Sequence, residues 1–509
     1  MSENNADIVY DAIVIGLGGV GSSHGHTRLF RHAYFEHPNY VPLCLKSTKM
    51  FQELSDWRLN VNINSNSRAD RQKHGQQDLI PLLEYCGVLV ISDGGKDGQT
   101  YDVIDRCANS ATKFDIPIKI MNTNELQNEY GDSFSFPTTT ANPKMKGLLE
   151  PDAGFVRSEL AIEYAIYDAL YDHDHPENNN NNNNNKSNKS KTDIIENVEV
   201  TNISLLDNNS EDDNNNSTTQ EIYLVETSDG CTYKTKGVIV TAGAWTSKLI
   251  PELNPYLKVT RQIQAWFTMP TVDSDDNNTN NDDSNNTSQR CFPSVGWFLD
   301  RDKDKLPIYG IPPDPLILSN NDILSKIALH GRDVLISPDD ERTKVTKEEI
   351  QEICYTIQDW IPHAANPKNI IESKACLYTM TPDGHFILDN VSNIRNVLKK
   401  KKKTTKTGKA RTTSSSRSSS SSSSNDVNKL DNDETSSSSS SSSSPPSAYS
   451  DKYSNIWCVA GLSGHGFKMT PALGEAIADL VMTVGEEEER GEGTTDLPID
   501  FLRISMDRF

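Results

Sequence analysis

The sequence has no run of the roughly 20 apolar residues that a membrane-spanning helix needs. Its start, Met-Ser-Glu-Asn-Asn-Ala-Asp, lacks the basic and apolar regions of a secretory signal. It also lacks an excess of positive charge, because 50 Lys and Arg face 72 Asp and Glu and give a formal net charge of -22. A phosphate backbone would repel such a chain. These absences favour a soluble intracellular protein that binds neither membranes nor nucleic acid.

Closely spaced cysteines are missing as well. Zinc sites use spacings such as Cys-x-x-Cys, and disulfide frameworks belong to small secreted chains. We therefore expect no metal site and no disulfide scaffold. A chain of 509 residues is instead long enough for two or three domains with large cores. The eight cysteines are Cys44, Cys86, Cys107, Cys231, Cys291, Cys354, Cys376 and Cys458.

Several segments contain too few apolar residues to form a core. Segments 178–192, 207–217 and 272–288 are rich in Asn and Asp, and 399–450 is rich in Lys and Ser. They cannot bury enough surface to offset the entropy of ordering, so we predict low-complexity loops and a disordered insert at 399–450. We interpret the basic run Lys399–Lys403 as a solvated loop, with a nuclear signal or an acid-binding patch as the alternative.

A glycine-rich turn near the start indicates a nucleotide-binding unit. An apolar strand expected over 10–15 leads into Gly16, Gly18 and Gly21, which fit the pattern G-x-G-x-x-G. The glycines allow a tight turn, the approach of backbone to a pyrophosphate, and close packing of the next helix. Further along, the hydrophobic pattern predicts helices over 39–59, 101–112 and 158–171 and a buried strand over 88–91.

Residues 374–389 are the centre of the functional prediction. They read Lys-Ala-Cys-Leu-Tyr-Thr-Met-Thr-Pro-Asp-Gly-His-Phe-Ile-Leu-Asp, which predicts a strand, a Pro-Asp-Gly turn and the start of a second strand. Cys376 and Tyr378 share one face of the first strand. Taken alone, such a cysteine is more often a small buried hydrophobe, and such a tyrosine a core residue with a satisfied hydroxyl.

Three further segments accompany this hairpin: Ser23-His-Gly-His-Thr-Arg-Leu-Phe-Arg-His-Ala-Tyr34, Thr241-Ala-Gly-Ala-Trp245 and Gly461-Leu-Ser-Gly-His-Gly-Phe-Lys468. With the glycine turn they resemble the monomeric sarcosine oxidase and L-pipecolate oxidase family, FAD-dependent amine oxidases of the D-amino-acid-oxidase-like superfamily. The family motif Cys-x-Tyr-Thr-x-Thr-Pro-Asp-x-His-Phe is matched by residues 376–386. The resemblance covers nearly the whole chain outside the low-complexity segments.

The resemblance implies a monomer with a two-domain α/β and α+β fold. The Rossmann-like FAD-binding domain would be discontinuous, from 8–75, 145–250 and 370–509. The substrate domain, with an antiparallel sheet, would comprise 76–144 and 251–369.

The resemblance also implies roles for individual residues. Arg31 and Lys468 would bind the substrate carboxylate, to which a guanidinium fork and an ammonium are suited. Lys326 would activate oxygen, and FAD would be attached covalently through the sulfur of Cys376. The full set is catalytic Lys326, His330, Arg28 and Tyr378, substrate-binding Arg31 and Lys468, and cofactor-binding Gly16, Gly18, Gly21, Thr27, Cys376, Gly464 and Gly466.

Residue patterns alone leave other interpretations open. Lys326 lies in an apolar stretch, where the alternative is a strand-edge lysine directed to solvent. A lone histidine such as His330 is otherwise structural, and Arg28 and Arg31 are otherwise solvated at the surface. The glycine-rich segment 461–468 is otherwise a flexible surface loop.

One part of the family pattern is missing. The family places a helix, a second strand and a terminal acid between the positions of Gly21 and His24, where this chain has only Ser22 and Ser23. Glu36 is the nearest candidate acid, but it follows no apolar strand. The chain is therefore either a truncated paralogue or a reading of the gene that omits an exon.

These observations predict oxidation of a secondary amino acid, of the sarcosine or L-pipecolate type, to an imine while O2 becomes H2O2. Fructosyl amino acids and N-methyltryptophan are further candidate substrates. The compartment would be the cytoplasm or the peroxisome, although the last three residues, Asp-Arg-Phe, do not fit a Ser-Lys-Leu signal. Two alternatives are a flavin-free relic that acts as a binding protein, and a dehydrogenase of the same fold that passes electrons to a carrier protein.

Overall fold

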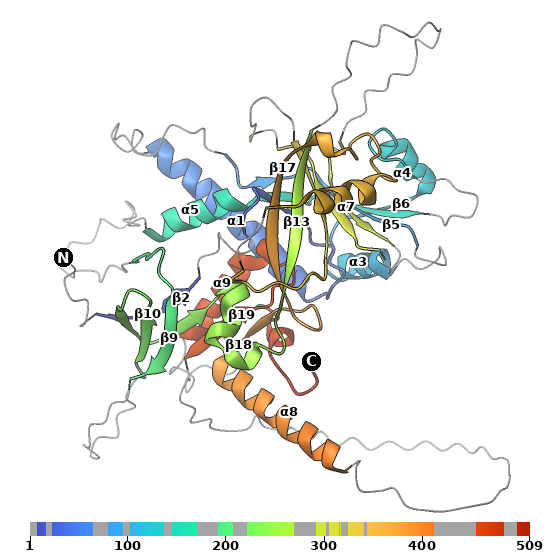
Figure 1. Ribbon diagram of the computed structural model, residues 1–509. Helices are drawn as coiled ribbons and strands as arrows, with labels where there is room; N and C mark the ends of the chain where they lie inside the picture. Colours follow the sequence, from blue (N-terminus) through green and yellow to red (C-terminus); the bar gives the residue numbers. More distant parts are fainter. Residues whose placement is uncertain are drawn as a thin grey trace, which may run out of the picture.

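A computed structural model describes residues 8–16, 23–64, 80–94, 102–136, 145–170, 192–206, 221–268, 292–301, 305–314, 316, 324–340, 344–411, 455–482 and 496–508. Gly18 and Gly21 lie outside these residues, as do the predicted loops 207–217 and 272–288 and nearly all of 178–192. The described chain forms four sheets and the helices that cover them (Figure 1).

The largest sheet is eight-stranded and mainly antiparallel. Its order is β17-β13-β16-β15-β14-β5-β7-β6, in which β14 and β5 form a parallel pair. The long strands β13 and β17 lie side by side (Figure 1). The strands are β5 (Val88–Ser92), β6 (Lys119–Asn122), β7 (Lys146–Glu150), β13 (Lys258–Thr268), β14 (Gly296–Asp300), β15 (Ile308–Ile311), β16 (Leu324–Leu329) and β17 (Ile370–Met380).

This sheet has two chemically different faces. On one face β13 contributes Ile263, Ala265 and Phe267 to a hydrophobic core, which side chains of α4 (Thr123–Tyr130) and α7 (Lys347–Ile357) complete. Consecutive strand residues point to opposite faces. The residues that alternate with this core therefore lie on the second face, which collects most of the polar groups described below.

A second sheet has the parallel core of a nucleotide-binding domain. Its order is β18-β19-β12-β2, and β12 pairs in parallel with both β19 and β2. Ile477 and Val481 of α9 pack on this sheet, and Val391 and Ile394 of α8 join its main core. These elements are β2 (Ile13–Ile15), β12 (Val238–Val240), β18 (Ile387–Asn390), β19 (Ile456–Ala460), α8 (Val391–Arg411) and α9 (Thr470–Met482).

The strand β2 lies at the edge of this second sheet. Among the described strands it pairs only with β12, and Val14 at its centre is 52% exposed. In a complete dinucleotide-binding fold the first strand is internal, because the strand of the next βα unit lies beside it. The short connection from Ile15 to β3 (Thr27–Phe30) has no room for that unit, in agreement with the truncation predicted from the sequence.

Two smaller sheets complete the fold. One has the order β1-β11-β10-β9, and the other has the order β3-β8-β4. No helix of the described chain is long and apolar enough to span a membrane. The remaining strands are β1 (Val9–Tyr10), β4 (Leu83–Glu84), β8 (Gly154–Arg157), β9 (Val200–Leu205), β10 (Tyr223–Thr227) and β11 (Thr232–Thr235).

Most of the predicted elements are present. The helices over 39–59, 101–112 and 158–171 are confirmed as α1 (Tyr40–Asn64), α3 (Asp102–Lys113) and α5 (Ser158–Leu170), and the strand over 88–91 as β5. The two strands predicted over 374–389 are present as β17 and β18, but they do not form a hairpin, because β17 pairs with β13 in the eight-stranded sheet and β18 pairs with β19 in the second sheet. The domain boundaries at 145 and 370 stay a prediction. They fall next to β7 and at the start of β17, which both pair within the eight-stranded sheet.

Two further predictions are wrong in part. The expected strand over 10–15 is divided, because β1 pairs with β11 in another sheet whereas β2 pairs with β12. The expected disorder over 399–450 does not begin at 399, since α8 continues to Arg411. The buried side chains of Val391, Ile394 and Leu398 anchor this helix, and lysine is a good helix former that lets it continue. Figure 1 shows α8 projecting from the body of the molecule.

Candidate active site

Lys326 is a buried amine on the second face of the eight-stranded sheet. Its side chain belongs to β16 and is 2% exposed. The Nζ atom donates hydrogen bonds to the carbonyl oxygens of Gly25 at 2.9 Å and Thr27 at 2.7 Å. Gly25 has a φ of 104° and His26 one of 62°, so a left-handed turn aims both carbonyls at the same atom. The alternative of a lysine directed to solvent is therefore excluded.

Burial also governs the charge of this lysine. Burial, followed by the nearby positive charge of Arg28, lowers the pKa of Lys326 well below its ordinary value. Carbonyl oxygens satisfy its donors but supply no full negative charge to balance an ammonium. The surroundings of Lys326 thus disfavour its protonated form, and a negative charge that develops beside it would favour that form.

Cys376 reaches the same face from β17, two strands away from Lys326. The strand register pairs Cys376 with Gln262 and Lys326 with Trp266 on β13, which lies between β17 and β16. Cys376 is 1% exposed. Between these pairs, Gln264 is 2% exposed, and its Oε1 atom has no hydrogen-bond partner among the described residues.

His330 and Tyr378 form the aromatic part of the site. The Oη atom of Tyr378 lies 3.5 Å from Nδ1 of His330, and the ring of Tyr309 lies 6.3 Å from the His330 ring. Burial lowers the pKa of His330 to about 4 and raises the pKa of Tyr378 well above its usual value. Both side chains are therefore uncharged at neutral pH, and they suit a neutral amine rather than an ion.

Arg31 and Lys468 come together around the ring of Tyr34. The Arg31 guanidinium lies 4.4 Å from the ring centre, and Nζ of Lys468 lies 3.3 Å from the Tyr34 hydroxyl oxygen. Arg31 also donates to Glu36 Oε2 at 3.0 Å and to the carbonyl oxygen of Ala33 at 2.6 Å. The structure thus brings the two predicted carboxylate-binding cations into one cluster. Two N–H groups of the Arg31 guanidinium already donate to Ala33 and Glu36.

The charges of this cluster follow from burial and mutual contact. Burial, assisted by Arg31, lowers the pKa of Lys468 to about 8. Burial alone would raise the pKa of Glu36, but the positive charges of Arg31 and Lys468, together with the nearby His465 ring, outweigh it and hold the pKa at about 2. Two cations and one carboxylate leave a net positive charge at neutral pH. Such a cluster can bind an anion.

Arg28 lies between the lysine and the carboxylate-binding cluster. It extends from β3 and donates to the carbonyl oxygens of Thr27 at 2.8 Å and His24 at 2.5 Å. Its positive charge lowers the pKa of both Lys326 and Lys468, so it is close to both. The alternative of solvated surface arginines does not hold for Arg31, which is 7% exposed.

The predicted cofactor-binding glycines lie at positions that a side chain could not occupy. Gly464 has a φ of 80°, and a Cβ atom there would lie 2.3 Å from the Tyr378 ring. At Gly466 it would lie 2.6 Å from Leu462, and at Gly16, where φ is 104°, 2.7 Å from the Thr241 carbonyl oxygen. The first of these contacts joins the 461–468 segment to β17, the strand that carries Cys376, so this segment is a packed part of the site.

Four further residues were not predicted as site residues. Tyr34 and His465 lie within the motifs quoted above, but their types alone are common in cores. Tyr309 has no signal in the sequence beyond a short strand. Glu36 was considered as a ribose-binding acid, and the structure instead pairs it with Arg31 at 3.0 Å, so it serves the carboxylate-binding cluster.

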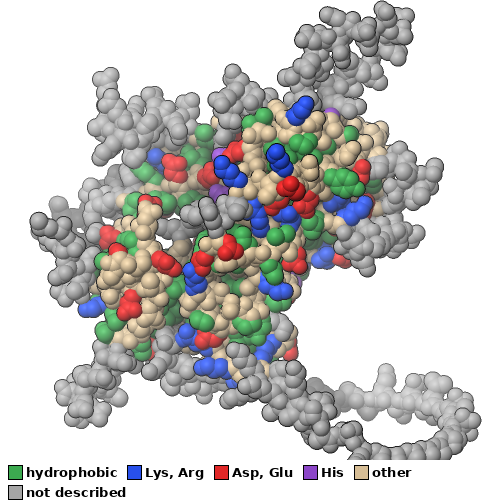
Figure 2. All heavy atoms as spheres, in the orientation of Figure 1, with side chains coloured by type: hydrophobic (Ala, Val, Ile, Leu, Met, Phe, Trp, Pro, Cys, Tyr) green, Lys and Arg blue, Asp and Glu red, His purple; other side chains and the backbone are tan. Residues whose placement is uncertain are grey.

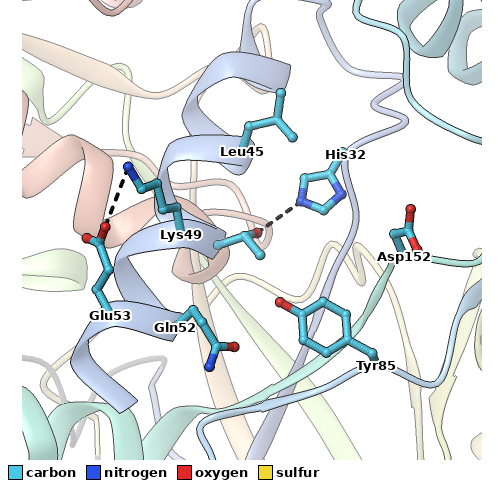
Figure 3. A pocket seen from close by; sticks show the side chains of 8 residues that line it. His32, Leu45, Lys49, Gln52, Glu53, Tyr85 and Asp152 are labelled. Atoms are coloured by element: carbon cyan, nitrogen blue, oxygen red, sulfur yellow. Dashed lines mark hydrogen bonds and ion pairs between the residues drawn. The ribbon is translucent and has the colours of Figure 1, made fainter. Parts of the chain in front are cut away.

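Two cavities lie outside this set of residues. One of about 420 Å³ is bounded by α1 and by His32, Tyr85 and Asp152 (Figure 3), and the hydroxyl of Thr48 lies 3.0 Å from Nε2 of His32 at its wall. The other, of about 250 Å³, lies beside Ile15 at the end of β2. On the face shown in Figure 2, acidic and basic side chains are intermixed across the described surface.

Comparison with known proteins identifies the family of this chain. The FAD dependent oxidoreductase (DAO) family matches residues 14–480, which is most of the chain. The chain belongs to this family.

Individual relatives share low sequence identity with this DAO-family chain. N-methyl-L-tryptophan oxidase of Yersinia pestis (strain Pestoides F) is 25% identical over 418 residues, covering 76% of this chain and 88% of the relative. Among solved structures, NikD, an unusual amino acid oxidase essential for nikkomycin biosynthesis, has a TM-score of 0.55 at 13% identity over 97% of this chain and 91% of that chain. Glycine oxidase from Geobacillus kaustophilus has a TM-score of 0.52 at 14% identity over 97% and 91%. These structures share the mixed α/β fold.

The residues present fit the flavin ring better than the nucleotide end of FAD. On the ring side, the unpartnered Gln264 oxygen, Cys376 and Lys326 lie on one sheet face beside the tightly packed loop of Gly464. On the nucleotide side, the described contribution is Gly16 and the exposed edge of β2. The described residues would therefore hold the ring end of the cofactor more fully than the nucleotide end.

Proposed function

We propose that this protein oxidises a secondary amino acid with one carboxylate, of the sarcosine, L-pipecolate or N-methyl-L-tryptophan type, to an imine and reduces O2 to H2O2. Bound FAD would supply the electron-transfer chemistry, attached through the sulfur of Cys376. The protein would contribute orientation and electrostatics.

Each protein group has a task in this proposal. Arg31 and Lys468 bind the substrate carboxylate, and Arg28 adds positive potential between that site and Lys326. His330 and Tyr378, both uncharged, face the amine and favour its neutral form. Lys326 stabilises the negative charge that develops on oxygen.

The observation that carries the proposal is the environment of Lys326. A lysine 2% exposed and bonded only to carbonyl oxygens among the described residues is costly to a fold. Its position on the same sheet face as Cys376 and two strands away favours a role beside the flavin ring. A carrier-dependent dehydrogenase of the same fold has no need of such a group, which favours the oxidase.

The test starts from the purified full-length chain. We expect a yellow protein whose flavin absorbance stays with the polypeptide after acid denaturation and is lost from it in Cys376→Ser. Peroxide is then measured with sarcosine, L-pipecolate and N-methyl-L-tryptophan. Yellow protein that forms no peroxide but reduces a dye would favour the dehydrogenase.

The second candidate function is a flavin-free binding protein. The exposed edge of β2 favours it, because the usual strand beside the first one is missing from the described sheet. Colourless protein that takes up no FAD from solution would support this candidate and contradict the oxidase.

A further inference from the structure

Tyr34 and His465 form a hydrogen-bonded chain behind the carboxylate-binding cluster. Nζ of Lys468 lies 3.3 Å from Oη of Tyr34, Oη lies 2.9 Å from Nδ1 of His465, and Nε2 of His465 lies 3.2 Å from the carbonyl oxygen of Gly384. Tyr34 is 1% exposed. Three segments far apart in the sequence thus meet through side-chain hydrogen bonds.

The direction of these bonds is fixed by protonation. Burial lowers the pKa of His465 to about 3, so the ring is neutral and carries one N–H. A carbonyl can only accept, so that N–H is on Nε2 and points to Gly384. Nδ1 is then an acceptor, and the Tyr34 hydroxyl must donate to it. The Tyr34 oxygen is left to accept from Lys468.

This direction determines what Lys468 can do. Its ammonium has three donors, of which one goes to Tyr34 and another to the carbonyl oxygen of His465 at 3.0 Å. Two fixed bonds set the direction of the remaining donor. We propose that Tyr34, oriented by His465, is the positioning residue that aims Lys468 at the substrate carboxylate and so sets the preference for anionic amino acids.

The inference rests on the proposed function, but carboxylate binding can be measured without turnover. Tyr34→Phe removes the hydroxyl and keeps the ring over Arg31. Tyr40→Phe is the matched control, since Tyr40 is also buried, its ring lies 5.3 Å from that of Tyr34, and its hydroxyl accepts a hydrogen bond from the backbone of Phe386 instead.

In the holoenzyme we expect Tyr34→Phe to raise KM for sarcosine about tenfold with kcat changed less than about threefold, because a charge-assisted hydrogen bond is lost from the binding step. The affinity for benzoate should fall by a similar factor, and that for uncharged benzamide should not change. KM should rise with pH as Lys468 loses its proton, and in Tyr34→Phe this rise should begin at a lower pH, because the ammonium loses a hydrogen-bond acceptor. Tyr40→Phe should leave all of these values unchanged.

The outcomes separate this inference from the proposed function. If the unmodified chain oxidises no amino acid, the proposed function fails, while benzoate titration still tests the positioning role. Three outcomes would each overturn the inference. They are an equal loss of benzoate affinity in Tyr34→Phe and Tyr40→Phe, an unchanged benzoate affinity in Tyr34→Phe, and no benzoate binding by the unmodified chain. If Tyr34→Phe does not fold, His465→Gln replaces it, with the same selective loss of benzoate binding expected.

Discussion

At the scale of single residues, burial sets the chemistry of this site. Lys326, Lys468 and His330 all have lowered pKa values for which burial is the largest cause. Glu36 shows the opposite balance, because three nearby positive or polar partners outweigh burial. Burial therefore lowers the pKa of two lysines, Lys326 on the sheet face and Lys468 in the segment 461–468.

Replacement of Lys326 tests its role directly. Lys326→Met removes the amine and keeps much of the volume, so we expect kcat/KM for O2 to fall about a hundredfold or more. The rate of flavin reduction by the amino acid under anaerobic conditions should change little. Lys374→Met is the control, because Lys374 lies on β17, two strands away, and pairs with Glu372 at 2.8 Å. Equal loss in both variants would contradict the assignment.

The ionisation of Lys468 predicts a pH dependence. Below its pKa of about 8 the side chain is a cation, and above it the attraction for a carboxylate is lost. KM for the amino acid should therefore rise as pH increases through about 8, and Lys468→Gln should abolish this limb. A KM that is independent of pH up to 10 in the unmodified enzyme would disagree.

At the scale of elements, one carboxylate connects the end of β7 to the loop that follows β3. Glu150, 1% exposed, accepts hydrogen bonds from the backbone N–H groups of His32 at 2.9 Å and Ala33 at 2.8 Å. Its Oε1 atom also lies 2.6 Å from Nδ1 of His32. These bonds hold the backbone on the C-terminal side of Arg31, and thereby the cation that would bind substrate.

Neutralising Glu150 should therefore weaken both stability and binding. We expect Glu150→Gln to lower the free energy of unfolding by about 2 kcal/mol, because an amide accepts fewer and weaker hydrogen bonds at a buried position. Thermal unfolding of the variant and of an exposed control, Asp152→Asn, would measure this. An unchanged melting temperature in Glu150→Gln would show that the loop is held in another way.

At the scale of the whole molecule, the described chain offers more contacts for the ring end of a flavin than for its nucleotide end. The eight-stranded sheet, through β17, and the segment 461–468 pack together where the ring end would lie. The parallel sheet ends at β2, with Val14 52% exposed. The proposed covalent bond to Cys376 would then replace much of the binding that a complete nucleotide-binding unit supplies.

This asymmetry predicts how flavin is retained. Cys376→Ser should lose its flavin during gel filtration, because the remaining contacts to the nucleotide end are few. Cys354→Ser, at a buried cysteine of α7 that packs against the opposite face of the eight-stranded sheet, is a control for general destabilisation and should keep its flavin bound. Retention of stoichiometric FAD by Cys376→Ser would mean that the described chain holds the nucleotide end without the missing unit.

The sequence by itself determined the elements and the family resemblance. Hydrophobic periodicity identifies α1, α3, α5 and β5, and the motif at 376–386 predicts a strand and turn, because each depends on neighbours within a few residues. The sequence-based predictions failed at 10–15 and at 399–411. At 10–15 the different pairing partners of β1 and β2 decided the outcome, and at 399–411 the buried first turns of α8 did. Only the tertiary structure decided that Lys326 faces Gly25 and Thr27, that Glu36 pairs with Arg31, and that Tyr34 and His465 stand behind Lys468. The contacts of Lys326 and of Tyr34 join segments hundreds of residues apart, and the burial that sets the charge of all these groups exists only after the chain has packed.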